Sequence, residues 1–171
     1  MTSELLWDLP LDDNATSASD YIQWARNILN AKQNLMAKRK PEIRVRTHGI
    51  YTKWESASRT LPKISEVTTK IKAVVDVEFG LIVNVKGGKN LELFYCIDHP
   101  GILDDQGARR PPFDGSVYVK TNDWDFYLGD TIWEPVHDKL GNWRMTLEID
   151  GNIVADKTFE LIEPADPRSA G

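Results

Sequence analysis

Several common features of secreted, membrane and redox proteins are missing from this chain of 171 residues. Cys96 is the one cysteine, so no disulfide can form within the chain. The longest uninterrupted apolar stretch, Leu93 to Ile97, is far shorter than the ~20 residues that a membrane-spanning helix needs. The opening residues Met1 to Glu4 lack the basic start and apolar centre of a signal peptide. Together these absences favour a cytoplasmic protein.

The sequence also lacks the short motifs that announce common chemistries. Gly87-Gly88-Lys89 is not a phosphate-binding loop, because the preceding glycine and the following Ser or Thr are missing. Neither Gly-x-Ser-x-Gly nor His-Glu-x-x-His occurs. The three histidines, His48, His99 and His137, have no metal-ligand spacing, and no second cysteine accompanies Cys96. The sequence therefore predicts no cofactor and no metal site.

One strong pattern is present between Ile71 and Val85, where every second residue is apolar. A period of two residues is typical of a strand with one buried face. At fifteen residues the run exceeds the ~5–6 of a usual strand. Gly80 near its middle suggests a bend. The pattern predicts one bent strand that crosses between sheets or pairs with two neighbours in succession.

Shorter alternating segments complete a mainly β prediction. We expect a first strand near 43–51, interrupted at Gly49, a connection over 55–66, a turn at 86–90 joining the long run to a partner strand at 91–97, and short strands at 117–120, 124–128 and 131–134. The clearest hairpin turns at Asp150-Gly151. About seven to eight antiparallel strands predict an immunoglobulin-like β-sandwich over residues 42–162, followed by a disordered tail at 163–171.

A single amphipathic helix is expected before the sandwich, over residues 19–40, with Ser19 as its N-cap and Pro41 beyond its end. Residues 1–18 are predicted to be an extended segment that either packs on its own domain or binds a groove of a partner. The helix must bury its apolar stripe on the sandwich or on another chain, because its basic residues gather at one end and do not suit a membrane surface. The residues expected to bind a partner are Trp7, Tyr21, Trp24, Ile28 and Leu35.

Several short motifs, taken in their order along the chain, carry a resemblance. The segment of roughly 42–162 resembles a family of short bacterial domains of unknown function with an immunoglobulin-like fold. The resemblance implies that fold and implies no activity and no catalytic residues. The motifs are Gly49-Ile50-Tyr51, Phe79-Gly80-Leu81-Ile82, His99-Pro100-Gly101, Leu140-Gly141-Asn142-Trp143, Asp150-Gly151 and Phe159.

The predicted loop over 98–116 is where function is most expected, because long loops on rigid sandwiches often carry it. Its polar residues are Asp98, His99, Asp104, Asp105, Arg109 and Arg110. Two carboxylates with a histidine serve acid–base chemistry in some enzymes. The favoured interpretation is a solvated loop whose arginines bind nearby carboxylates, since no nucleophile motif accompanies the cluster.

Charge is segregated along the chain, although the net charge is only −5. Residues 32–72 carry eleven basic and three acidic residues, whereas 73–171 carry nine basic and eighteen acidic ones. A basic belt attracts anions or nucleic acid, but the acidic whole argues against nucleic acid and favours a belt that lies against the protein's own acidic sheet. The candidate anion-binding residues are Lys38, Arg39, Lys40, Arg44 and Arg46.

These observations rank three functional hypotheses. The first is a non-enzymatic interaction or structural module that binds another protein, or a second copy, through the N-terminal helix. The second is a metal-dependent or acid–base hydrolase that uses the 98–116 loop with His137. The third is anion or nucleic-acid binding by the basic segment.

Overall fold

The computed structural model describes residues 17–36, 40–55, 58 and 60–164, and of residues 30–36 it describes the backbone alone. The chain divides into two compact units, residues 1–39 and 40–171. Among the described residues, no helix is long and apolar enough to cross a membrane. The predictions for residues 1–16, including Trp7, and for Lys38, Arg39 and the end of the tail lie outside the described residues.

The first unit contains the helix α1, Ala18–Met36. Its N-cap is Ser17: the Asp20 amide donates to the Ser17 hydroxyl oxygen at 3.1 Å, and that hydroxyl donates to the Asp20 carboxylate at 2.8 Å. The prediction of Ser19 as the cap was wrong by two residues, because this reciprocal pair requires an acidic residue three positions after the cap. Ser19 lies inside the first turn.

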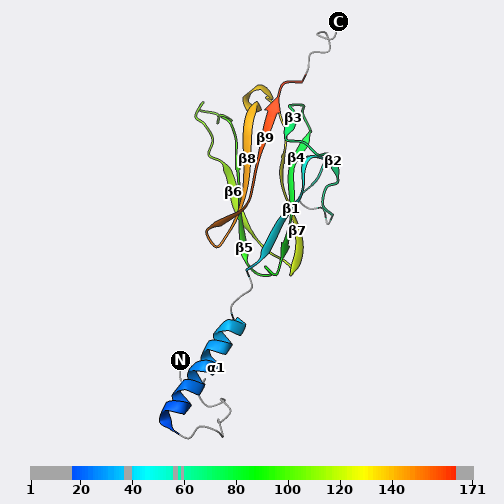
Figure 1. The fold of residues 1–171 in the computed structure, drawn as a ribbon. Coiled ribbons are helices and arrows are strands. Elements are labelled where there is room, and N and C mark those ends of the chain that lie inside the picture. The colour runs from blue at the N-terminus through cyan, green and yellow to red at the C-terminus, as the bar shows by residue number, and fades with distance from the viewer. Residues whose placement is uncertain (1–16, 37–39, 56–57, 59, 165–171) are drawn as a thin grey trace. The chain divides into compact units, whose positions relative to one another are not determined.

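The second unit is a β-sandwich in which two sheets face each other (Figure 1). The four-stranded sheet has the order β2-β1-β4-β7, and the five-stranded sheet has the order β3-β9-β8-β5-β6. The strands of the four-stranded sheet are β1 Glu42–Tyr51, β2 Ile64–Glu66, β4 Glu78–Lys86 and β7 Asp123–Thr131. The strands of the five-stranded sheet are β3 Lys70–Lys72, β5 Glu92–Asp98, β6 Phe113–Tyr118, β8 Gly141–Ile149 and β9 Asn152–Ile162. The predicted fold class is confirmed.

The core lies between the sheets because both contribute alternating apolar residues. Leu81 of β4 and Leu147 of β8 are fully buried, and Trp143 of β8 packs its ring edge-on against Phe79 of β4, with centroids 5.5 Å apart. Burying one such side chain stabilises the fold by about 1.5–3 kcal/mol.

The long alternating run from Ile71 to Val85 crosses between the sheets, as one of its two predicted forms requires. It is not one strand bent at Gly80. Ile71 belongs to β3, which pairs in parallel with β9, and the chain then turns before β4 begins at Glu78. Asp76, with a φ of 68°, lies in that turn. The alternation continues through both strands because each of them turns every second residue towards the same core.

Gly80 instead allows a close approach of strands. It pairs with Gly49 of β1 on one side and with Gly129 of β7 on the other, so three glycines form a row across the four-stranded sheet. A Cβ atom at Gly80 would collide with the Leu128 carbonyl oxygen and the Gly129 Cα. Because those atoms are backbone, no side-chain movement relieves the contact.

Of the two predicted hairpin turns, one is confirmed and one is wrong. The hairpin at Asp150-Gly151 is confirmed, since β8 and β9 pair antiparallel around it. The turn at 86–90 is not a hairpin, because it joins β4 of one sheet to β5 of the other.

Boundaries were also displaced. The loop predicted to extend to 116 ends where β6 begins, and the strands expected at 124–128 and 131–134 are a single β7 that ends at Thr131. Strand β1 runs through Gly49 without interruption, and β2 lies inside the predicted 55–66 connection. Position in a sheet, and not propensity, set these ends.

Candidate functional site

The loop between β5 and β6 is organised around His99, which is 1% exposed. Its Nδ1 accepts a hydrogen bond from the Ile102 amide at 3.1 Å. Its Nε2 lies 3.2 Å from the Pro111 carbonyl oxygen. Since Nδ1 accepts, Nε2 carries the proton and donates to Pro111. Both ring nitrogens are occupied in holding the two ends of the loop together, so His99 is not placed to act as an acid or base.

The charged residues of the loop also bind the loop itself. Arg109 donates to the Asp98 carboxylate at 2.7 Å and to the His99 carbonyl oxygen at 2.5 Å. Asp104 accepts from the Gln106 and Ala108 amides, both at 2.9 Å, which closes a tight turn. These contacts match the favoured interpretation of the sequence, in which the arginines bind nearby carboxylates.

Arg110, near the end of the loop, makes the longest ion pair of these residues. It donates through Nε to the Leu103 carbonyl oxygen at 3.2 Å and lies 4.0 Å from the Asp105 carboxylate. The two histidines outside the loop lie elsewhere: His137 in the short 3₁₀ turn His137–Lys139, and His48 on β1, where burial, and then Lys157, lowers its pKa. No group of three or more His, Cys, Asp or Glu within the described residues could hold a metal ion.

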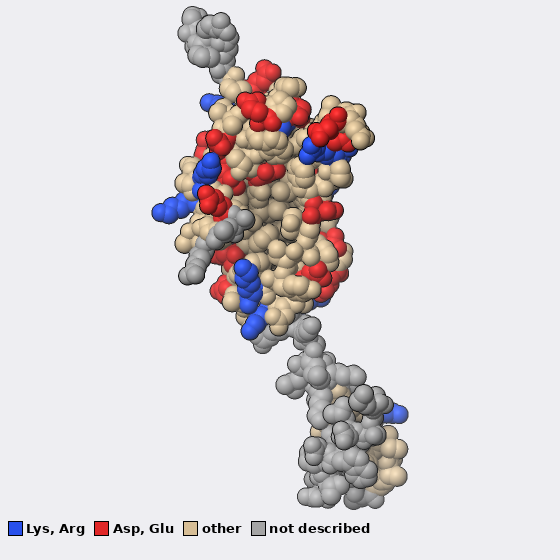
Figure 2. Space-filling model, turned by 180° about the vertical axis from the view of Figure 1, so that it is seen from behind, with Lys and Arg blue, Asp and Glu red and all other residues tan. Residues whose placement is uncertain are grey.

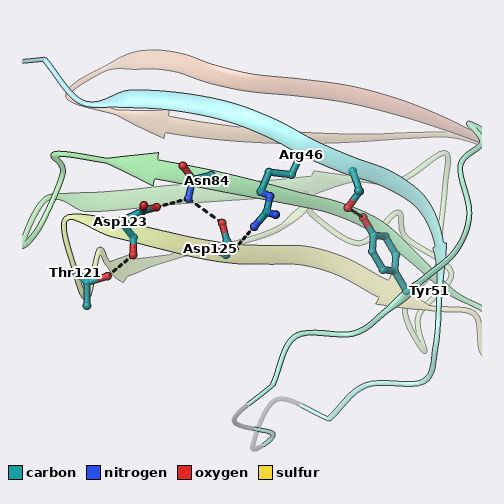
Figure 3. A network of polar contacts seen from close by, with 7 residues as sticks. Arg46, Tyr51, Asn84, Thr121, Asp123 and Asp125 are labelled. Carbon is teal, nitrogen blue, oxygen red and sulfur yellow. Dashed lines mark hydrogen bonds and ion pairs between the residues drawn. The ribbon is translucent and has the colours of Figure 1, made fainter.

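The outer face of the four-stranded sheet carries a polar network (Figure 3). Arg46 donates to Asp125 of β7 at 2.5 Å, and the Asn84 amide nitrogen on β4 donates to both Asp123, at 2.6 Å, and Asp125, at 2.9 Å. Thr121 donates to the Asp123 carbonyl oxygen at 2.7 Å. The network binds the acidic side chains of β7 with groups from the adjacent strand β4 and from β1 beyond it.

A β-bulge in β1 positions Arg46 for this contact. Val45 pairs with Val83 and Thr47 pairs with Ile82, so Arg46 is the extra residue between them. Bulges redirect the side chains beside them. Asn84, Asp123 and Asp125 were missed from the sequence. The spacing of Asp123 and Asp125, two residues apart around Trp124, was the one signal that they share a face.

The described residues of the predicted anion-binding segment, Lys40, Arg44 and Arg46, do not all line one hollow. A shallow hollow of about 610 Å³ is lined by Arg44, Arg46 and Lys86, but also by Asn84, Asp123 and Asp125. Arg44 pairs with Glu42, and Arg46 with Asp125. Lys40 lines a different hollow, with Ile43 and Ile149. The two described arginines therefore have carboxylate partners, and the belt meets the protein's own acidic strand β7.

A buried carboxylate, Glu78, lies at the other end of this sheet face. It is 4% exposed, and it accepts from the Tyr127 hydroxyl at 2.7 Å and the Thr131 hydroxyl at 2.6 Å. Burial, and then the Glu78 charge, raises the pKa of Tyr127 far above its usual value. On the core side of β7, burial and Glu78 also raise the pKa of Asp130 to about 6, although the Thr131 amide and Lys139 act against them.

A buried cation, Lys139, is a second feature that the sequence did not reveal. Its Nζ donates to the Pro135 carbonyl oxygen and to Asp138, both at 2.7 Å, and lies 4.4 Å from the centre of the Trp133 ring. The Trp143 indole nitrogen donates to the Lys139 carbonyl oxygen at 2.8 Å. Such full pairing is what lets a charge be buried, and its role here is structural.

In the helix α1, three of the five predicted partner-binding residues have described side chains. The Tyr21 and Trp24 rings lie 5.3 Å apart, and Tyr21 is 43% exposed, whereas Trp24 and Ile28 are half-buried. Ile22 and Leu29, which are not among those five, are more exposed than any of these. They lie seven residues apart and therefore on one side of the helix.

The comparisons with known proteins agree with this architecture. Residues 39–161 match the model of DUF3859, a domain of unknown function. The chain belongs to the DUF3859 family. No curated protein matches. The crystal structure of an immunoglobulin-like protein from Pseudomonas aeruginosa is similar, with a TM-score of 0.56 and 20% identity, over 74% of this chain and 99% of that one.

This similarity confirms the predicted immunoglobulin-like fold, and at such identity it shows the fold alone. A second structure, the alkylpurine DNA glycosylase AlkC of Pseudomonas fluorescens bound to DNA containing an abasic site analogue, covers 85% of this chain and 40% of its own. Its TM-score of 0.36 and identity of 13% carry no argument for a shared function.

Proposed function

We propose that this DUF3859 protein is a non-enzymatic protein-interaction module, with the sandwich as its rigid base and α1 as the element that contacts another protein or a second copy. The observation that carries the proposal is the apolar surface of α1. Tyr21, Ile22 and Leu29 are 43%, 54% and 52% exposed, on a helix that belongs to a compact unit of its own. Amphipathic helices that keep such surface in water are typical of helix-in-groove recognition.

The loop geometry supports a binding role over catalysis. A hydrolase that used the β5–β6 loop would need a histidine with one free nitrogen near a reactive site. His99 has neither nitrogen free, and Asp98 and Asp104 are held by Arg109 and by backbone amides. The loop therefore supports the sandwich as a scaffold.

The test compares two charge-altering double variants of the full chain. I22E/L29E places carboxylates in the apolar surface of α1. Q23E/N27K changes the opposite side, where the Gln23 amide donates to Asn27 at 3.3 Å, and replaces that contact by an ion pair of the same spacing. Light scattering gives the oligomeric state of each variant, and affinity capture with quantitative mass spectrometry gives its set of bound proteins.

We expect I22E/L29E to lose the oligomer or the bound partner and Q23E/N27K to keep it, with equal helix content by circular dichroism. Loss of the oligomer identifies a second copy as the partner, and loss of a captured protein from a monomer identifies a different chain. An unchanged mass together with an unchanged set of partners in I22E/L29E contradicts the proposal.

A further inference from the structure

Strand β6 leaves one side of its backbone open. It is the last strand of the five-stranded sheet, and β5 is its one strand partner within the described residues. Just beyond its end, the Val119 amide donates to the Leu91 carbonyl oxygen at 2.9 Å. Hydrogen-bonded pairs alternate along an antiparallel ladder. The backbone groups of Asp114, Ser116 and Tyr118 therefore point away from β5, towards the open edge.

The same three residues turn their side chains outward, where the sheet surface is hollowed. The hollow holds about 440 Å³ over β6, β5 and β8, and its outward-facing lining includes Phe94, Asp114, Ser116 and Glu148. Phe94 is 45% exposed, and Tyr118, beside it on β6, is 64% exposed. Two aromatic faces thus stand in water beside a strand with one open edge, which is a recurrent arrangement for peptide binding.

The charged side chains around Phe94 on this surface are acidic. Glu92, Asp114 and Glu148 surround Phe94, and none of them forms an ion pair within the part of the chain that the structure describes. Glu92 accepts a hydrogen bond from Ser116 at 2.7 Å, which leaves its charge uncompensated. Burial, and then the Asp98 and Asp114 charges, raises the pKa of the Cys96 thiol, while Arg144 acts in the opposite direction.

Acidic side chains are also common on the rest of the sandwich surface. On the face that Figure 2 shows, acidic side chains in red are spread widely over the sandwich, and basic side chains in blue form smaller groups. A second copy paired through β6 would bring its own Glu92, Asp114 and Glu148 towards these three carboxylates. Like charges across an interface oppose association, so the charge disfavours a second copy and favours a basic partner.

We propose that β6 and the outward-facing side chains beside it bind an extended basic segment of another protein. The segment adds a strand to the sheet by pairing with the backbone of Asp114, Ser116 and Tyr118. Its alternate Lys or Arg side chains lie over the Phe94 ring and against Asp114 and Glu148. This surface and the exposed side of α1 consist of different residues, and the proposal stands independently of the helix.

The experiment uses the full chain and a synthetic, end-capped ten-residue peptide in which Arg alternates with Thr. Backbone amide shifts of the isotope-labelled protein are followed by NMR during titration. We expect the largest shift changes at residues 114–118. A peptide with Glu in place of Arg should not bind. A peptide that keeps every Arg but has Pro at two central Thr positions should bind roughly tenfold more weakly, because it cannot complete the strand.

Protein variants distinguish binding at this surface from unspecific attraction by the net negative charge of the protein. D114N/E148Q should weaken binding roughly fivefold. The matched control E66Q/D150N removes two exposed carboxylates that have no ion pair with any described residue and lie outside the hollow, and it should bind as the wild type does. I22E/L29E should also bind normally, so failure of the helix proposal and failure of this one give different results.

Three outcomes would overturn the proposal. The first is no shift change at millimolar peptide. The second is equal weakening by D114N/E148Q and E66Q/D150N, or equal binding of the Pro-containing peptide, either of which reduces the effect to unspecific charge. The third is a concentration-dependent dimer whose shift changes fall on β6, which assigns the edge to a second copy.

Discussion

The outer face of the four-stranded sheet and the β5–β6 side of the five-stranded sheet differ in how their polar groups are paired. On the four-stranded sheet, Asp125 is bound by Arg46 and by Asn84, and Glu78 is buried beneath hydroxyl donors. On the five-stranded sheet, Asp114 and Glu148 have no ion pair within the described residues and Phe94 stands exposed between them.

The difference shows which surface of the sandwich keeps groups that a partner could bind. Polar groups that satisfy each other stabilise the sheet and have little left to offer a ligand. Unpaired charges and aromatic rings beside an open strand edge keep their binding capacity. A charged residue is therefore informative about function only when its contacts are known, which is why the sequence alone left open whether Arg46 faces an anion or the protein's own acidic residues.

In the core, unlike on the outer faces, the two sheets should respond alike to mutation. L81A in the four-stranded sheet and L147A in the five-stranded sheet each empty a fully buried site, so both should lower the free energy of unfolding by about 2–5 kcal/mol. Chemical denaturation measures both. A cost confined to one variant would mean that the sheets do not share one core.

Asp130 should give the four-stranded sheet its own pH dependence. Its pKa is about 6 in the folded protein, above the roughly 3.9 of an unfolded Asp, so the folded state holds the proton more tightly. The free energy of unfolding should therefore fall by roughly 2–3 kcal/mol between pH 4 and pH 6 from this group alone. D130N should remove that dependence when denaturation is repeated across this range, and D114N should not.

Two tyrosines compare the outer faces directly. Y127F removes a buried hydroxyl that donates to Glu78, and it should cost about 1–3 kcal/mol because the buried carboxylate loses a donor. Y118F alters a hydroxyl on a side chain that is 64% exposed and should leave stability unchanged within about 0.5 kcal/mol. Thermal and chemical unfolding give both values. Equal costs would contradict the contrast between the faces.

The exposed ion pairs should matter least. R46A breaks the contact with Asp125 and should cost at most about 1 kcal/mol, less at high salt. R144A breaks the bidentate contact with Asp156, whose pKa is lowered chiefly by its hydrogen bonds from Arg144, and should cost less still because both groups lie in solvent. Denaturation at low and high salt ranks the two, and a larger loss for R144A would contradict this order.

Much of the scaffold could be predicted because period-two alternation reports burial directly. The hairpin of β8 and β9, the helix and the sandwich class all follow from such local patterns. The break after β3 and the role of Gly80 could not be predicted in this way. One long strand and two successive strands from different sheets show the same alternation when both bury their apolar residues in one core. The loop residues were named correctly, but their pairing with each other, such as Arg109 with Asp98, is a tertiary fact.

The sequence by itself determined the apolar faces, the helix and the order of the elements, since these depend on residues a few positions apart. Tertiary structure alone decided which polar groups meet. It placed the bulged Arg46 beside Asp125, 79 residues away, buried Lys139 against Trp133, and left β6 at an edge with Phe94 in water. Such pairings depend on which strands become neighbours, and neighbours are chosen by the packing of a whole core rather than by any local pattern.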